Sequence, residues 1–167
     1  QIRWTASLFA LVAMLLSFYT FLVYYVDYRE TGGFQFTHAW RWLEIPGPWA
    51  HWERGITLTL GVDGIAALMV LLTGIVMFTG VLISWTISDR NKDFFILYFL
   101  LLSGVFGVFS SLDLFFFFLF YELAVVPMYL LIGIWGSSSK FSTFVRTKEY
   151  SATKLTIYLV AGSILVW

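Results

Sequence analysis

The sequence predicts an all-α fold, a polytopic bundle of transmembrane helices, and three observations support that prediction. Hydrophobic residues make up 60% of the chain and charged residues only 12%. A soluble domain of this size carries about twice that share of charge. The apolar stretches are continuous and do not alternate with polar residues, which is typical of membrane helices and not of barrel strands. We therefore expect an integral, multi-pass membrane protein.

Five apolar stretches account for most of the chain, which we treat as a single membrane domain of residues 1–167. A membrane-spanning helix needs about 20 apolar residues. The predicted spans cover residues 4–26, 64–87, 94–110, 114–135 and 151–167. Between the first two lies a polar, aromatic-rich connection, residues 27–57, which contains Trp40, Trp42, Trp49 and Trp52. Because indole rings collect at headgroup depth, we expect this connection to lie along the membrane interface.

The basic residues of the connections predict the orientation of the bundle. One side carries Arg3, Arg90, Lys92, Lys140, Arg146 and Lys148, and the other side carries Arg29, Arg41 and Arg54. Lys and Arg are enriched in the loops on the cytoplasmic side of a membrane. We therefore expect the N-terminal end and residues 136–150 on the cytoplasmic or matrix side.

Composition also argues against several classes of partner and site. Ten Lys and Arg residues balance ten Asp and Glu residues, so the net charge indicates no nucleic-acid partner. The chain has no cysteine, which excludes disulfides, Cys-ligated zinc and iron–sulfur ligation within it. His38 and His51 have no second ligand at metal spacing, so we expect no metal site. A chain that starts at Gln1 and stops at Trp167, inside an apolar run, is expected to be a piece of a longer protein.

One carboxylate interrupts the fourth predicted span. Residues 114–135 are apolar except for Glu122, which follows Asp113 by nine residues. At about 1.5 Å of rise per residue, Glu122 lies about 13 Å below Asp113, near the midplane of a core about 30 Å thick. An ionisable group at that depth costs about 2.5–3.5 kcal/mol, and such groups usually mark ion pathways.

Two interpretations of Glu122 compete. It is either a neutral carboxylic acid hydrogen-bonded to a neighbouring helix, or a proton-accepting site in apolar surroundings. We favour the proton-accepting site because Pro127 lies five residues further along the same span. A proline removes the hydrogen bond to the carbonyl four residues earlier, here that of Leu123, so we predict a break in the helix beside the site. A free carbonyl beside a carboxylate can hold the water that a proton path needs.

Three other charged residues lie in or beside the predicted spans. Lys154 lies about one turn into the last span, and it is either a snorkelling lysine or a proton-relay cation. The sequence leaves these two interpretations open. Asp63 and Asp113 each precede a predicted helix, and we expect each of them to cap it.

Small side chains recur along one face of the third span. Ser103, Gly107 and Ser111 are spaced four residues apart. Small residues on one face let a second helix approach closely, so we expect this face to be buried in the bundle.

Three motifs carry a resemblance to a known family. The first is DLFFFFLFYELAVVPMY, residues 113–129, followed by IGIWG at residues 132–136. The second is GVDGIAALMVLLT, residues 61–73, and the third is SATK, residues 151–154. With these motifs in this order, the chain resembles the antiporter-like, proton-translocating membrane subunits of respiratory complex I, and among them most closely the chain 4 (chain M) family of NADH:quinone oxidoreductase.

The resemblance implies a function and a role for two residues. Glu122 matches the glutamate on the family's fifth helix, which pairs with a lysine on the seventh, and the five spans then match helices two to six. Lys154 lies where the family carries a lysine on helix six. The resemblance thus implies that Glu122 and Lys154 serve proton translocation in an enzyme complex, while this chain holds no redox site.

The same resemblance implies that cofactors and partners lie outside the chain. NADH, flavin, iron–sulfur clusters and quinone are expected in other subunits, and no cofactor is expected in this one. The expected partners are the other membrane subunits of complex I and the lipid bilayer of a bacterial plasma membrane or a mitochondrial inner membrane. Two alternatives stay open: a subunit of a multi-subunit sodium/proton antiporter or membrane-bound hydrogenase, and a non-transporting membrane scaffold.

Overall fold

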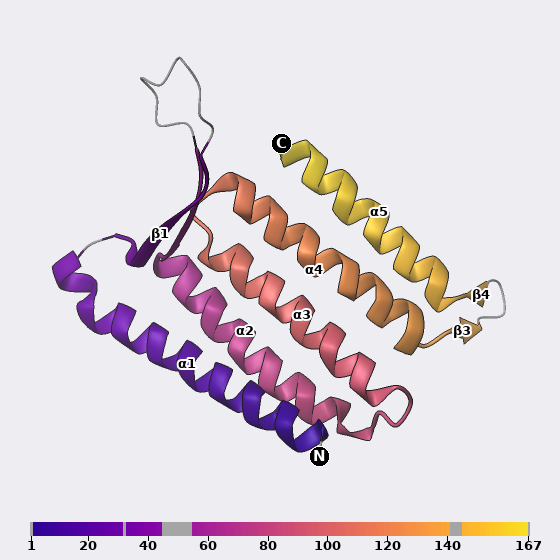
Figure 1. Cartoon of the computed structure of the whole chain (residues 1–167). Helices are drawn as coiled ribbons and strands as arrows, with labels where there is room; N and C mark the ends of the chain where they lie inside the picture. The colour runs from indigo at the N-terminus through magenta and orange to yellow at the C-terminus, as the bar shows by residue number, and fades with distance from the viewer. Residues whose placement is uncertain (1, 32, 45–54, 141–144, 167) are drawn as a thin grey trace.

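The computed structural model describes residues 2–31, 33–44, 55–140 and 145–166 (Figure 1). Its helices are α1 (Ile2–Thr31), α2 (Gly64–Ile83), α3 (Asn91–Ser110), α4 (Leu114–Trp135) and α5 (Lys148–Val166), with a short 3-10 turn, Ser84–Thr86, after α2. Among the described residues, the strands pair as two hairpins, β1 (Gln35–Glu44) with β2 (Gly55–Val62) and β3 (Ser139–Lys140) with β4 (Val145–Arg146).

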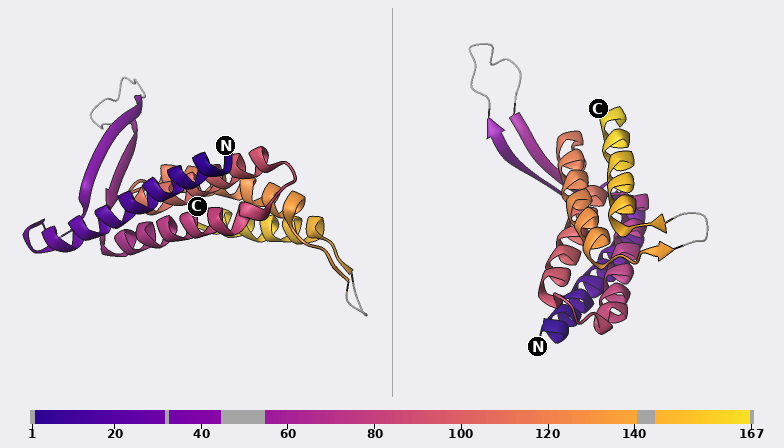
Figure 2. Two further views of the ribbon diagram at one scale, coloured as in Figure 1. Left: turned by 90° about the horizontal axis from the view of Figure 1, so that it is seen from below. Right: turned by 90° about the vertical axis from the view of Figure 1, so that its right-hand side faces the viewer.

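The helices lie side by side in chain order. Each helix packs chiefly against the helix before it and the helix after it, and the chain reverses direction at each connection (Figure 1). Short connections lead to antiparallel neighbours in this way. One end of the row holds the N-terminus, the turn between α2 and α3, and β3 with β4. The hairpin of β1 and β2 projects from the opposite end, away from the helices (Figure 2).

Four helical segments are long and apolar enough to cross a membrane: residues 2–26 of α1, residues 64–86, α3 and α4. They confirm the polytopic helical fold, and α4 has the predicted bounds of 114–135. α5 also forms, but it is not among the four. Its 19 residues begin with Lys148 and Glu149 and include Lys154, which lowers its mean hydropathy. That α5 spans the membrane therefore stays a prediction.

The connection between α1 and α2 contains structure that the sequence analysis missed. α1 continues past residue 26 to Thr31, and β1 and β2 then pair in antiparallel fashion, from Gln35 with Val62 to Glu44 with Gly55. The sequence of β2, GITLTLGV, alternates Thr with larger apolar residues, which is the period-two pattern of a strand. The location of this connection at a membrane interface stays a prediction. Parts of it lie outside the described residues: Trp49, His51 and Trp52.

The hairpin of β1 and β2 is fixed to the start of α4. The backbone amide of Leu112 donates to the carbonyl oxygen of Thr59 over 2.9 Å. The ring centroid of Trp42 lies 5.5 Å from that of Phe116, in an edge-on arrangement that aromatic pairs favour. These contacts hold the turn from which α4 begins.

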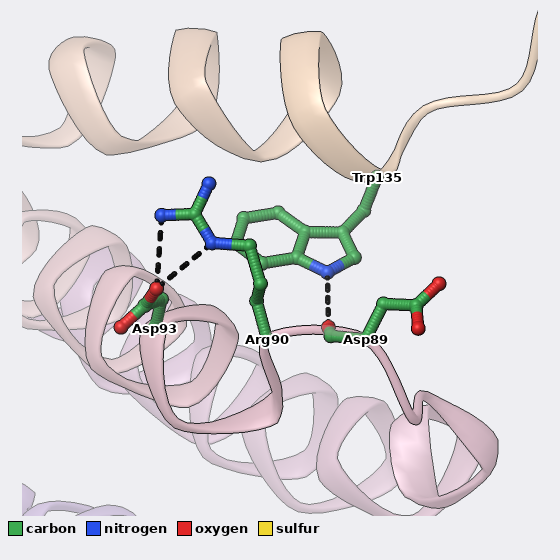
Figure 3. Close-up of polar contacts among 4 residues, drawn as sticks. All are labelled: Asp89, Arg90, Asp93 and Trp135. Carbon is green, nitrogen blue, oxygen red and sulfur yellow. Dashed lines mark hydrogen bonds and ion pairs between the residues drawn. The ribbon is translucent and has the colours of Figure 1, made fainter.

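The turn between α2 and α3 is joined to α1 and α4 at the end of the bundle that holds the N-terminus. Arg3 of α1 donates from Nη2 to the carbonyl oxygen of Ile87 over 3.0 Å. Trp135, the last residue of α4, donates from Nε1 to the carbonyl oxygen of Asp89 over 2.9 Å (Figure 3). Beside this contact, Arg90 forms an exposed ion pair with Asp93 in the first turn of α3. The N-terminus and these turns thus share one end, as the orientation argument assumed. Which side of a membrane this end faces stays a prediction.

Candidate functional site

The start of α4 sets the position of Glu122 along the helix. Asp113 caps the helix, because its Oδ1 accepts from the amides of Phe115 over 2.8 Å and Phe116 over 3.2 Å. Asp63 caps α2 in the same way, through an amide of the first turn over 2.6 Å. Both predicted capping roles are confirmed. Glu122 is the ninth residue of α4, about 12 Å along the axis from the first.

The contact between α3 and α4 determines which way Glu122 faces. A Cβ added at Gly104 of α3 would lie 2.9 Å from the amide nitrogen of Ala124 and 2.9 Å from the carbonyl oxygen of Phe120. Phe120 and Ala124 therefore lie on the face of α4 that meets α3. Glu122 is two residues from each, and at about 100° per residue it points to nearly the opposite side of the helix. α5 packs on that side (Figure 1).

The small residues at this contact differ from the predicted ones. Gly107 packs against the ring of Phe120, as predicted for a buried face. Ser103 is exposed, and Ser111 lies beyond the last residue of α3. The close contact with α4 is formed by Gly104 and Gly107, where an added Cβ would meet atoms of Phe120 or Ala124. The prediction of a buried face was therefore wrong for Ser103, while Ser111 is half-buried as the C-cap of α3.

Glu122 contacts α5 through a side-chain hydrogen bond. The hydroxyl group of Ser163 donates to Oε1 of Glu122 over 2.9 Å. Ser163 is only 6% exposed, and Glu122 is half-buried. One residue earlier on α4, the hydroxyl group of Tyr121 donates to the carbonyl oxygen of Leu159 over 3.4 Å. The carboxyl group thus has a neighbouring helix and a polar partner, which both interpretations of Glu122 allow. Its depth in a bilayer stays a prediction.

Pro127 does not break α4. The helix runs without interruption from Leu114 to Trp135, and the side chain of Pro127 is fully buried. The helix continues because a proline deletes a single backbone hydrogen bond, here to the carbonyl of Leu123, while the bonds before and after it maintain the helix. A distortion of the helix axis at residues 123–127 stays a prediction. That water binds beside this carbonyl stays a prediction.

Lys154 lies away from Glu122 along α5. It is exposed, and its Nζ lies 5.9 Å from the ring centroid of Tyr150 and 5.9 Å from that of Tyr158, about one turn to either side. Ser163, the residue that contacts Glu122, is nine residues beyond Lys154, or about 13 Å of helix. The structure therefore does not bring the two predicted site residues together. The choice between a snorkelling lysine and a proton-relay cation stays open.

The histidines give no second site among the described residues. His38 Nδ1 lies 3.2 Å from the carbonyl oxygen of Thr37, and its ring packs edge-on against that of Trp40 with centroids 4.9 Å apart. Within the described residues, no group of three or more His, Asp or Glu side chains is arranged to hold a metal ion. His51 lies outside the described residues.

Ser163 stands in no motif of the sequence, but chain order carries a signal for it. α4 and α5 are antiparallel neighbours joined by one connection, so residues at similar distances from that connection lie side by side. Glu122 stands 13 residues before Trp135, and Ser163 stands 15 residues after Lys148. Matching these distances identifies the last part of α5 as the segment opposite Glu122.

Comparison with known proteins relates the chain to a family. The NAD(P)H-quinone oxidoreductase chain 4, chloroplastic, of Chara vulgaris is 36% identical over 167 residues, which cover 99% of this chain and 30% of that protein. The NADH-quinone oxidoreductase subunit M of Pseudomonas aeruginosa is 38% identical over 175 residues, which cover 98% of this chain and 31% of that protein. The chain is homologous to the chain 4 (subunit M) family. It spans less than a third of the length of these two relatives.

The fold of the chain has a counterpart among solved structures. A chain in the membrane-bound sulfane sulfur reductase, an archaeal respiratory membrane complex, matches with a TM-score of 0.63 and 20% identity. The match covers 96% of this chain and 28% of that one, and it shows a shared fold. A scan against models of protein families gives no match. Homology and the four apolar helical segments together confirm an integral, multi-pass membrane protein.

Proposed function

We propose that this chain is part of a proton-translocating membrane subunit of an NADH:quinone oxidoreductase. Nearly its whole length is homologous to chain 4 and subunit M of such enzymes. The observation that carries the proposal is the carboxyl group of Glu122 in α4, which faces the hydroxyl group of Ser163 in α5. The proposed task is to couple electron transfer in other subunits to the movement of protons.

Glu122 suits a proton carrier because of its helix and its surroundings. It is the sole acidic residue of α4, and α4 is apolar enough to cross a membrane. An ionisable group at the centre of a bilayer costs about 2.5–3.5 kcal/mol, so such residues are rare where they serve no function. A carboxylate accepts a proton, and the resulting acid donates a hydrogen bond, so the same side chain has partners in both states.

The energy scale of such contacts matches the task. Moving one elementary charge against 100 mV costs about 2.3 kcal/mol. A hydrogen bond to a charged group contributes about 1.5–3 kcal/mol. The free energy of one or two such contacts at Glu122 is therefore comparable to that of moving one proton against this potential.

Lys154 and the partners of the chain contribute to the proposed function less directly than Glu122. A proton-relay role for Lys154 needs an intermediate step, because about 13 Å of helix separates it from Ser163. NADH, flavin, iron–sulfur clusters and quinone are proposed to bind other subunits, and this chain contributes no redox site. Its proposed partners are the other membrane subunits of the complex and the surrounding lipid.

The test is the replacement Glu122→Gln in the complete complex. Gln keeps the size and the hydrogen bond to Ser163 but does not ionise, so it separates packing from proton chemistry. We expect the complex to assemble, to lose most of its coupled, quinone-dependent activity in intact membranes, and to retain NADH oxidation by its detached electron-transfer subunits.

A matched control is Tyr121→Phe, which removes the neighbouring contact between α4 and α5 and leaves the carboxyl group in place. We expect this variant to keep its coupled activity. Wild-type coupled activity of the Glu122→Gln complex would make Glu122 a structural residue and would favour a non-transporting scaffold.

A further inference from the structure

The hydroxyl group of Ser163 has two acceptors and one hydrogen. Its Oγ lies 2.9 Å from Oε1 of Glu122 and 2.9 Å from the carbonyl oxygen of Val160, about one turn earlier on α5. A serine hydroxyl donates one hydrogen bond and accepts through two lone pairs. It therefore donates to one of the two oxygens at a time. If it donates to Val160, its contact with Glu122 is a hydrogen bond only when the glutamic acid is the donor.

We propose that Ser163 is a positioning residue whose hydroxyl group reverses its hydrogen bond when Glu122 gains or loses a proton. The inference rests on the proposed function of Glu122. When Glu122 is ionised it only accepts, and Ser163 donates to Oε1. When Glu122 is protonated, its O–H donates to Oγ, and Ser163 donates to the carbonyl oxygen of Val160. Ser163 keeps its own hydrogen throughout, and the proton on Glu122 comes from and returns to the proton path.

Burial makes the second acceptor important. Ser163 is 6% exposed, so the protein itself has to supply its partners. A buried donor or acceptor left unpaired costs more than a hydrogen bond contributes. Because the two acceptors lie at equal distances, both protonation states of Glu122 are satisfied after rotation about one C–O bond. Helices α4 and α5 do not have to move.

The other hydroxyl groups along α5 lack this arrangement. Thr156 donates to the carbonyl oxygen of Ala152 over 3.0 Å, and Thr153 donates to that of Glu149 over 2.9 Å. These are the usual bonds of a helical threonine to its own backbone. Ser163 differs because it also contacts a carboxyl group of the next helix. Thr156 is therefore a matched control on the same helix.

The experiment compares three variants of the complete complex: Ser163→Ala, which removes the hydroxyl group, Ser163→Thr, which keeps it, and Thr156→Val, which removes a hydroxyl group that contacts only backbone. Two quantities are measured, the coupled turnover and the infrared stretching band of the protonated carboxyl group. The band of Glu122 is identified as the one that disappears in Glu122→Gln.

We expect Ser163→Ala to lower coupled turnover about 10-fold, the effect of losing one hydrogen bond to a charged group. Its carboxyl band should move to higher frequency, because the acid has lost its partner. Ser163→Thr should restore both quantities, and Thr156→Val should leave both at wild-type values. A hydroxyl group that only packed against α4, without a hydrogen bond to the protonated carboxyl group, would not move the band.

Two results would overturn the inference: wild-type turnover with an unshifted band in Ser163→Ala, or an equal loss in Thr156→Val. If Ser163→Ala fails to assemble, Ser163→Cys replaces it, since a thiol is a weaker donor of similar shape, and an unshifted band in that variant contradicts the inference. Normal pumping by Glu122→Gln would refute the proposed function itself. Lost pumping in Glu122→Gln together with wild-type behaviour of Ser163→Ala would refute the role of Ser163 alone.

Discussion

Replacing Gly104 by Val should force α3 and α4 apart. The first added carbon alone would lie 2.9 Å from the amide nitrogen and the Cβ of Ala124 and 2.9 Å from the carbonyl oxygen of Phe120. Two of these three atoms belong to the backbone, so no side-chain rotation relieves the contact. Overpacking of this kind costs about 1–3 kcal/mol. The better helix propensity of Val recovers only about 0.4 kcal/mol, so we expect a net loss of about 2 kcal/mol.

The assay is equilibrium unfolding of the purified subunit in mixed micelles with increasing amounts of denaturing detergent. Gly133→Val on α4 is the matched control, because within the described part of the chain nothing outside its own helical turn lies within 4 Å of a Cβ added at that residue. We expect this control to keep the wild-type midpoint within error. Equal midpoints for Gly104→Val and Gly133→Val would refute the close contact between α3 and α4, and with it the argument for the direction of Glu122.

Three further changes have defined outcomes. Asp113→Ala removes the cap of α4 and should cost about 1 kcal/mol in the same unfolding assay, whereas Asp113→Asn should cost less; equal losses would contradict capping. Trp135→Phe removes the bond to the carbonyl oxygen of Asp89 and should also cost about 1 kcal/mol, so an unchanged midpoint would show that this contact contributes nothing. Lys154→Met should lower coupled activity less than Glu122→Gln does, because Lys154 does not contact Glu122; wild-type activity would make it a snorkelling lysine.

Much of the helical fold follows from the sequence because water and lipid impose simple rules. Continuous apolar runs between polar turns gave the bounds of α4 and placed most other helix ends within a few residues. Asp63 and Asp113 were identifiable as caps because each is an acidic residue directly before an apolar run, where unpaired amides need an acceptor. Glu122 was identifiable because it is an ionisable residue inside an apolar run, where placing a charge in the membrane costs free energy.

What the sequence analysis missed depends on contacts between segments. The sequence of β2, which pairs with β1, has the period of two of a strand. The aromatic residues of β1 obscure this pattern and indicate a membrane interface instead. Pro127 has no backbone N–H and so removes one hydrogen bond of α4, but the helix continues through it. Ser163 became a candidate only when α4 and α5 were placed side by side, because its partner is 41 residues away along the chain.

The most direct test of the central claim is the number of protons translocated per electron by the complete complex that carries Glu122→Gln. It is measured in sealed membrane vesicles during NADH oxidation, with assembly verified on the same preparation. If Glu122 carries protons, the ratio falls below the wild-type value by the contribution of this subunit, while the complex stays assembled. An assembled complex with an unchanged ratio would show that Glu122 only packs against α5, and the account of this site would be wrong.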